Sequence, residues 1–226
     1  MTEEELKLRN SRQETLAPYE KLKNSECVVV GSGAVGRNVA KQLASLGVKS
    51  LQIWDHDTVE IENLAPQGYN ENQLKKNKAE VTGEDCVLLN SSLDLKTENR
   101  RFARSDYKNL MGKFVFLCVD SIDTRKHIYD SAIKAGAKWI GDTRVAGEVI
   151  RIITETNPKV DSKYSTTLFN ESEVFVGSCH AKMFTPGAMV AAGAVVAKFT
   201  QALRESLDAF TDHNINLSGW DLFETP

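Results

Sequence analysis

Residues 28–67 read VVVGSGAVGRNVAKQLASLGVKSLQIWDHDTVEIENLAPQ. This stretch predicts a buried strand, a glycine turn, a helix and a second strand that ends in two aspartates. Gly31 and Gly33 allow a tight turn and close backbone approach, Gly36 lets the helix pack on the strand, and the N–H groups that open the helix attract phosphate. Asp55 ends the second strand, where an acidic side chain reaches a ribose hydroxyl. The stretch therefore indicates a bound nucleotide, although dinucleotide and mononucleotide binders share the glycine motif.

The rest of the chain fits around this unit as one α/β domain over residues 1–226. Further strands are expected at residues 114–119 and 139–140, helices at 124–134 and 187–209, and an antiparallel strand at 147–154. A third strand is expected near residues 87–89 or 93–95, and residues 58–78 read as mostly loop. Strands that alternate with helices predict a Rossmann-like, mostly parallel sheet with helices on both faces, plus an antiparallel extension. Residues 1–24 predict an N-terminal helical arm and residues 158–185 a crossover loop.

Composition narrows the class of protein. A chain of 226 residues with 41% hydrophobic content can bury one substantial core. The net charge of -3 argues against a nucleic-acid surface. The longest apolar run, residues 187–197, is shorter than the roughly 20 residues that a membrane span requires. The opening residues are acidic and polar, so no signal peptide is expected, and a cytoplasmic location is the prediction.

The four cysteines show no metal-binding or disulfide pattern. Cys27, Cys86, Cys118 and Cys179 lie far apart, and no C-x-x-C pair occurs. The first three lie in apolar stretches and are expected to be small core residues.

Several polar residues recur in an order that carries a family resemblance. The motif G-x-G-x-x-G, the phrase LASLGVKSLQIWDHDTVEIENL at residues 43–64, a later lysine and the segment CVDSIDTR at residues 118–125 are present in this order. Together they resemble the ThiF/MoeB/HesA-type adenylyltransferases, which are related to ubiquitin-activating enzymes. The resemblance covers residues 9–202, nearly the whole chain.

The resemblance implies an ATP-dependent reaction. In this family the enzyme binds ATP and Mg²⁺, and the C-terminal carboxylate of a small ubiquitin-like (β-grasp) or sulfur-carrier protein, or of a peptide, attacks the α-phosphorus. The products are an acyl-adenylate and pyrophosphate. Chemistry of this kind depends on positioning and positive charge more than on a covalent nucleophile.

The resemblance also assigns roles to residues. Asp55 matches the family's ribose-binding aspartate, and Asn63 its phosphate-side asparagine. Lys78 matches a lysine that neutralises the phosphates and the developing negative charge. Asp120 matches the aspartate that holds magnesium, a metal that prefers oxygen ligands. Asp57 is expected to support the loop.

An N-terminal motif extends the match. Residues 9–13, RNSRQ, resemble the R-x-x-R-Q opening of these enzymes, whose second arginine reaches the neighbouring subunit's ATP site. The resemblance therefore implies that Arg12 acts in trans and that the active unit is a homodimer.

One position departs from the family pattern. The family phrase N-L-x-R-Q is here Asn63-Leu64-Ala65-Pro66-Gln67, so the arginine is replaced by Pro66. We hypothesise that Arg37, at the start of the helix after the glycine turn, supplies the missing charge. A cation at a helix N-terminus opposes the helix dipole unless an anion is present.

Cys179 leaves two interpretations open. It precedes Pro186 as a cysteine often does in this family, where some members use it to take the acyl group in a covalent adduct. A thiolate is a competent nucleophile toward an acyl-adenylate. Other members stop at the adenylate, and the thiol is then inert.

Two other functions remain as alternatives. The glycine turn with Asp55 would also bind the cofactor of an NAD-dependent oxidoreductase, but that function leaves Asn63, Lys78 and Asp120 unexplained. A non-catalytic partner of an activating enzyme is favoured only by Pro66. The identity of the carrier stays open.

Overall fold

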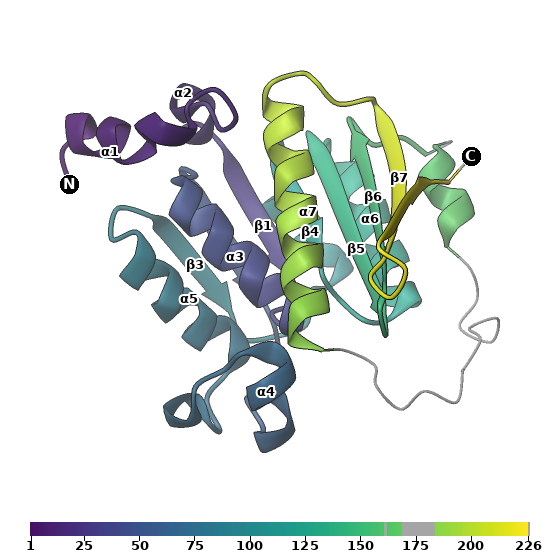
Figure 1. Ribbon diagram of the computed structural model, residues 1–226, viewed down its shortest axis with the longest axis horizontal. Coiled ribbons are helices and arrows are strands. Elements are labelled where there is room, and N and C mark those ends of the chain that lie inside the picture. The colour runs from purple at the N-terminus through teal and green to yellow at the C-terminus, as the bar shows by residue number, and fades with distance from the viewer. Residues whose placement is uncertain (161, 169–183, 226) are drawn as a thin grey trace.

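One mixed sheet organises the chain. The computed structural model describes residues 1–160, 162–168 and 184–225 (Figure 1). Its strands are β1 (Glu26–Val30), β2 (Ser50–Trp54), β3 (Asp94–Glu98), β4 (Phe114–Leu117), β5 (Trp139–Ala146), β6 (Val149–Thr156), β7 (Phe210–Asn216) and β8 (Asp221–Glu224). Within the described residues they form one sheet in the order β3-β2-β1-β4-β5-β6-β7-β8. Pairs from β3 to β5 are parallel and pairs from β5 to β8 antiparallel, which confirms the predicted mostly parallel sheet with its extension.

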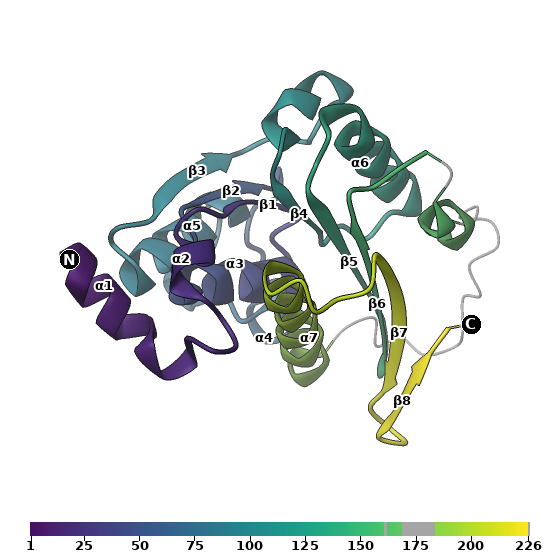
Figure 2. The ribbon, with the colours of Figure 1, turned by 90° about the horizontal axis from the view of Figure 1, so that it is seen from above.

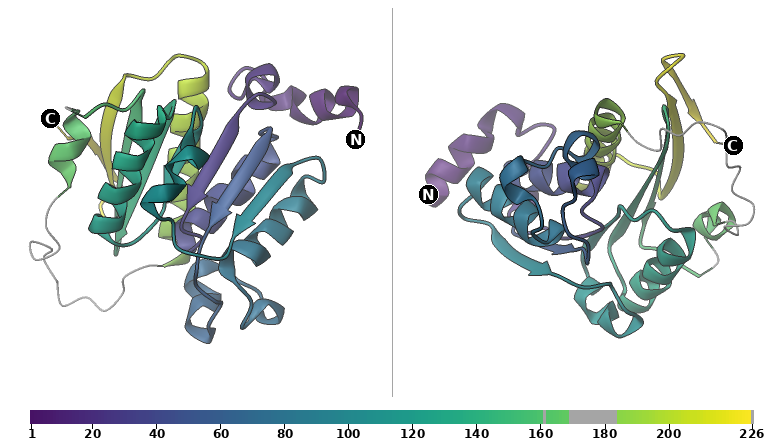
Figure 3. Two further views of the ribbon diagram at one scale, coloured as in Figure 1. Left: turned by 180° about the vertical axis from the view of Figure 1, so that it is seen from behind. Right: turned by 90° about the horizontal axis from the view of Figure 1, so that it is seen from below.

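Helices cover both faces of this sheet, as predicted. They are α1 (Glu3–Asn10), α2 (Tyr19–Leu22), α3 (Ala34–Leu46), α4 (Leu64–Gln67), α5 (Lys78–Leu89), α6 (Ile122–Ala135) and α7 (Thr185–Leu203). Short 3-10 helices are η1 (Ser11–Gln13), η2 (Ile61–Asn63), η3 (Glu71–Gln73), η4 (Arg104–Leu110) and η5 (Lys163–Thr167). Helices α3, α5 and α7 lie on one face (Figure 2), whereas α6 and η4 lie on the other, which Figure 3 shows from behind. Among these helices, none is long and apolar enough to cross a membrane within the described residues.

The alternation of side chains along β1 divides the core in two. Cys27 and Val29 face α3 and α7 in one apolar cluster, while Val28 and Val30 face α6 in the other. A strand that is covered on both faces needs apolar residues at every position, which explains the uninterrupted run in β1. The predicted core positions of Cys27 and Cys86 are confirmed, and Cys118 is partly buried.

The unit β1–α3–β2 forms as the sequence predicts. β2 lies parallel to β1, with Val30 opposite Trp54. Helix α3 ends at Gly47, which has a left-handed φ of 86°. Glycine adopts this conformation at no steric cost, so the helix ends here and the chain turns into β2.

After β2 the chain forms α5 and β3. Helix α5 was not predicted, and it includes residues 87–89, one of the two expected sites of the third strand. The other expected site, residues 93–95, is confirmed, because it overlaps β3 at residues 94–98. Asn77 caps α5, because its side chain accepts the backbone N–H of Glu80. β3 was hard to locate because it is an edge strand with polar residues and no continuous apolar run.

The C-terminal part also differs. Helix α7 ends at Leu203 and not at residue 209, and Glu205 has a positive φ of 57° that directs the chain into β7. The strands β7 and β8 were not predicted, because polar residues interrupt both. The crossover expected at residues 158–185 contains η5 among the described residues, while residues 169–183 lie outside them.

The N-terminal arm lies at the end of the sheet where the parallel strands begin (Figure 1). Arg9 of this arm donates hydrogen bonds to the carbonyl oxygens of Ser45 at 3.2 Å and Leu89 at 2.9 Å. These carbonyls belong to the last turns of α3 and α5, where a cation is favourable. One arginine thus caps two helices.

Candidate functional site

The glycine turn between β1 and α3 brings the backbone into close contact. Gly31 has a φ of 93°, and a Cβ there would lie 2.6 Å from the carbonyl oxygen of Cys118. A Cβ on Gly36 would lie 1.8 Å from the carbonyl oxygen of Gly31. Only glycine fits at these two positions, so the predicted steric reason for both glycines is confirmed.

Gly33 plays a different part, because it is the N-cap of α3 and carries no side chain to cap the helix. The nearest atom to a Cβ at Gly33 would be Oε1 of Gln67, 3.9 Å away. Among the described residues, no side chain of the N-cap accepts the backbone N–H groups in the first turn of α3. Such a helix start suits a phosphate group.

Asp55 is fixed directly beside this turn. Its carboxylate accepts the backbone N–H of Ser32 at 2.6 Å and that of Asp57 at 2.9 Å. Burial raises the pKa of Asp55, and these two backbone hydrogen bonds oppose the rise. The aspartate is thus held rigidly at the end of β2, next to the start of α3.

Lys78 belongs to the same cluster. It is the first residue of α5, its residue surface is 6% exposed, and its Nζ lies 3.1 Å from Oδ2 of Asp57. A buried ammonium group is costly unless an anion pairs with it, and Asp57 supplies that anion. The structure therefore brings together the glycine turn, Asp55, Asp57 and Lys78.

Sequence reasoning missed Asn77, which holds this cluster together. Its amide nitrogen lies 3.0 Å from the carbonyl oxygens of both Asp55 and Asp57, while its side-chain oxygen caps α5. The spacing of Asn77 and Glu80 at the start of a helical segment was the available signal. Asn77 fixes the loop that carries Asp57 relative to the helix that begins with Lys78.

Asp120 lies in the loop after the strand that neighbours β1. It is exposed and follows β4, which lies next to β1 in the sheet. The loop that carries it touches the glycine turn, because the carbonyl of Cys118 lies against Gly31. Its metal-binding role stays a prediction.

Asn63 ends η2 and is half-buried. Its side-chain oxygen accepts the backbone N–H of Glu60 at 3.0 Å, so this oxygen stabilises the loop. The predicted contact with phosphate remains untested.

Arg37, which was expected to supply charge on the phosphate side, is buried in an ion pair. It is 2% exposed, its Nη2 lies 2.6 Å from Oδ2 of Asp85 on α5, and its guanidinium lies 4.3 Å from the ring centre of Tyr69. Its Nη1 has no hydrogen-bond partner among the described residues. The charge of Arg37 is therefore balanced by Asp85, and its role toward phosphate stays a prediction.

The remaining two predicted residues lie outside this cluster. Arg12 is exposed on η1. The N-terminal arm that contains η1 lies at the end of the sheet where the parallel strands begin, opposite the glycine turn (Figure 1). Cys179 falls outside the described residues.

The donor set at the end of β2 suits a hard cation. Asp55, His56 and Asp57 each offer one ligand atom, and these three atoms lie within 4.8 Å of one another. Mg²⁺ prefers carboxylate oxygens as ligands, so Asp55 and Asp57 are candidate ligands in addition to the predicted Asp120.

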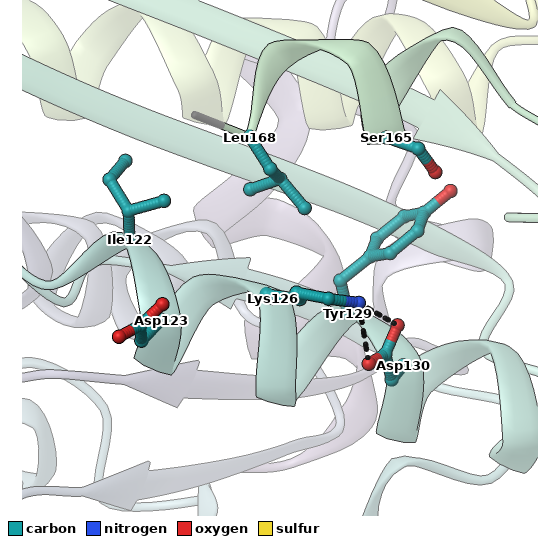
Figure 4. A pocket seen from close by; sticks show the side chains of 7 residues that line it. All are labelled: Ile122, Asp123, Lys126, Tyr129, Asp130, Ser165 and Leu168. Atoms are coloured by element: carbon teal, nitrogen blue, oxygen red, sulfur yellow. Dashed lines mark hydrogen bonds and ion pairs between the residues drawn. The ribbon is translucent and has the colours of Figure 1, made fainter. Parts of the chain in front are cut away.

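A separate hollow lies on the other face of the sheet, between α6 and η5 (Figure 4). Lys126 and Asp130 form an ion pair of 3.1 Å at its rim. Its lining residues are Ile122, Asp123, Lys126, Tyr129, Asp130, Ser165 and Leu168. None of them belongs to the cluster at the glycine turn.

The sequence profile of the ThiF family matches residues 5–223. The chain belongs to the ThiF family. It is 31% identical over 142 residues to the sulfur carrier protein ThiS adenylyltransferase of Bacillus subtilis, an alignment that covers 58% of this chain and 42% of that protein. It is 24% identical over 153 residues to ubiquitin-like modifier-activating enzyme 5 of Dictyostelium discoideum, covering 60% of this chain and 40% of that protein. This ThiF-family chain thus spans less than half the length of these curated relatives.

Solved structures share the fold. The crystal structure of PaaA superposes on this chain with a TM-score of 0.79 at 19% identity, and the alignment covers 100% of this chain and 74% of the PaaA chain. MccB of E. coli with bound ATP superposes with a TM-score of 0.78 at 16% identity, and the alignment covers 96% of this chain and 71% of the MccB chain. At these identities the likeness establishes the fold alone.

Proposed function

We propose that this chain is an ATP-dependent adenylyltransferase that activates the C-terminal carboxylate of a small β-grasp carrier protein or of a peptide. One observation carries the proposal. The start of α3, which no side chain caps, lies together with Asp55 and the buried Lys78 at the carboxyl ends of β1 and β2, beside the loop of Asp120. Membership of the ThiF family supports it, as do relatives whose names state adenylyltransferase activity.

The reaction uses few protein groups. An oxygen of the acceptor carboxylate bonds to the α-phosphorus of ATP, the bond to the bridging oxygen breaks, and pyrophosphate leaves with its electron pair. Gly33 leaves room for the phosphates at the start of α3, while Gly31 and Gly36 let the turn and the helix pack closely. Asp55 accepts a hydrogen bond from a ribose hydroxyl. Bound Mg²⁺ would neutralise phosphate charge.

Charged residues complete the proposed site. Lys78 stabilises the charge that develops on the phosphates, and Asp57 keeps it in place until the nucleotide arrives. Asp120 holds Mg²⁺, while the amide of Asn63 donates to a phosphate oxygen. Arg37 supplies further charge on the phosphate side, where Pro66 replaces an arginine.

Three further parts of the proposal concern assembly and location. Residues 1–226 form a single adenylation domain, which works in the cytoplasm. The proposed active unit is a homodimer in which Arg12, on η1 of the N-terminal arm, reaches the site of a second copy. If the reaction continues beyond the acyl-adenylate, the thiolate of Cys179 takes the acyl group and AMP leaves.

The test begins with calorimetry, because binding requires no carrier. We expect heat on addition of magnesium-ATP and none with NAD. Lys78→Gln should weaken binding of magnesium-ATP about 10- to 100-fold, because a hydrogen bond to a charged group contributes about 1.5–3 kcal/mol. Lys75→Gln is the matched control, since Lys75 is exposed and pairs with Glu60.

Catalysis is tested by ATP–pyrophosphate exchange with small β-grasp proteins that end in glycine as candidate carriers. Exchange that depends on such a protein supports the proposal. NAD binding without exchange would instead favour an oxidoreductase. Binding of neither nucleotide would favour a non-catalytic partner.

A further inference from the structure

A carboxylate that the sequence does not single out lies at the centre of a buried charged cluster. Asp142 on β5 is fully buried, next to Leu117 of β4 in the sheet. Its carboxylate accepts hydrogen bonds from Arg125, from Nε of Arg144 at 2.8 Å and from the hydroxyl of Tyr164 at 3.0 Å. These donors come from three different segments, so Asp142 joins them.

Arg125 connects this carboxylate to the loop of Asp120. It lies on α6, is 4% exposed, and also donates to the carbonyl oxygens of Val119 and of Thr143, the latter at 3.1 Å. Val119 immediately precedes Asp120 in the chain. The planar guanidinium offers several donors in a fixed geometry, so one arginine can hold this backbone and Asp142 together, which lysine cannot do.

On its other side the cluster holds η5. Arg144 donates to the carbonyl oxygen of Thr167 at 2.7 Å and to its hydroxyl at 3.0 Å. Tyr164 stacks on Tyr129 with ring centres 4.1 Å apart. Figure 4 shows Tyr129 directed from α6 toward this turn. Asp142 thus ties η5 to the loop after β4.

The charges make Asp142 hard to replace. Two guanidinium groups share one carboxylate, and burial lowers the pKa of Arg125 to about 10, with the charge of Arg144 adding to the effect. Without the carboxylate, two buried cations would face each other unpaired, and they would separate or draw in water.

We infer that Asp142 is a positioning residue: through Arg125 it fixes the backbone of Asp120, and so sets the metal side of the nucleotide site. The inference rests on the proposed function, since it takes Asp120 as the magnesium ligand. Residues that hold a ligand in place typically change metal affinity about 10- to 100-fold when they are replaced.

Asp142→Asn tests this, and Asp212→Asn is the matched control. Asp212 is also a buried carboxylate paired with an arginine, because Arg151 donates to it from Nε at 2.9 Å, but this pair joins β6 to β7. The first measurement is amide hydrogen exchange in the nucleotide-free protein. We expect faster exchange at residues 118–121 in Asp142→Asn, and faster exchange confined to β6 and β7 in Asp212→Asn.

The second measurement compares two ligands by calorimetry. Affinity for magnesium-ATP should fall about 10- to 100-fold in Asp142→Asn, while affinity for AMP without magnesium should stay unchanged, because Asp55 and the start of α3 are untouched. Asp212→Asn should leave both affinities unchanged. Arg125→Lys serves as a second variant if Asp142→Asn fails to fold, and the same loss is expected.

Two outcomes would overturn the inference. One is an equal loss of both ligands in Asp142→Asn, which would indicate general destabilisation. The other is unchanged exchange at residues 118–121. If the wild-type chain bound no magnesium-ATP, the proposed function would fail instead, and hydrogen exchange would still show whether Asp142 holds the loop.

Discussion

Gly36→Ala offers a test in which the structure gives the size of the perturbation. The added Cβ would lie 1.8 Å from the carbonyl oxygen of Gly31, whereas real Cβ contacts stay beyond 3.0 Å. The turn and the helix must therefore separate by at least about 1.2 Å, the difference between these two distances. The same Cβ would also lie 3.0 Å from Cβ of Cys118, so the turn has little room to move on that side.

Two effects should follow from this displacement. Overpacking of this kind costs about 1–3 kcal/mol, which for a chain of this size lowers the melting temperature by about 2–12 °C. The displaced N–H groups of α3 would lose hydrogen bonds to phosphate, and each bond to a charged group contributes about 1.5–3 kcal/mol. Magnesium-ATP affinity should therefore fall at least about tenfold.

Gly193→Ala is the matched control, because Gly193 also lies within a helix but a Cβ there would meet no atom within 4 Å. Alanine favours a helix interior by about 0.5–1 kcal/mol over glycine, so the melting temperature should not fall. Both variants are measured by thermal unfolding and by calorimetry with magnesium-ATP. If Gly36→Ala bound the nucleotide as tightly as Gly193→Ala, the assignment of phosphate to the start of α3 would be wrong.

Three further predictions test other parts of the site. Gly33→Ala should keep the melting temperature within about 4 °C of wild type, because the added Cβ meets nothing nearer than 3.9 Å. It should still weaken magnesium-ATP binding, because the methyl group fills the space beside the first turn of α3. Equal binding of wild type and variant in calorimetry would place the phosphate elsewhere. Arg37→Ala should lower the free energy of unfolding, measured in urea, by about 3 kcal/mol, because it leaves the charge of Asp85 unpaired. The double variant with Asp85→Ala should recover part of the lost stability. Unchanged ATP affinity in Arg37→Ala would contradict the proposed phosphate role of Arg37. Burial raises the folded-state pKa of Asp55 above 3.8, so the folded chain binds this proton more tightly than the unfolded chain does, and its stabilising effect declines as pH rises through the raised pKa. In urea titrations, wild type should thus lose stability relative to Asp55→Asn as pH rises from 3.8 through the raised pKa, and a constant difference would contradict the raised pKa.

The parts of the fold that could be predicted are those whose residues face apolar surroundings on every side. β1 and β4 are covered on both faces and read as continuous apolar runs, and Gly47 marks the end of α3. β3 and β8 lie at the sheet edges, and none of their residues is buried, so their sequences carry no such run.

The residues of the candidate site also divide into those that could be predicted from the sequence and those that could not. Asp55 and Lys78 could be predicted because they lie at fixed spacings from the glycine motif, and the structure brings them together. Asp142 could not be predicted, since a single acidic residue in a strand gives no sign of the donors that reach it. Those donors come from α6, β5 and η5, and only the tertiary fold brings them to one carboxylate.

The double cap made by Arg9 has a consequence for any shortened form of the protein. Helix α3 begins at the glycine turn and α5 begins at Lys78, and the guanidinium of Arg9 binds carbonyl oxygens at the far ends of both helices. The spacing between these two starting points is therefore set in part from the remote end of the molecule. Proteolytic removal of the first ten residues would free the ends of both helices together. It would thereby disturb the site where the nucleotide is proposed to bind.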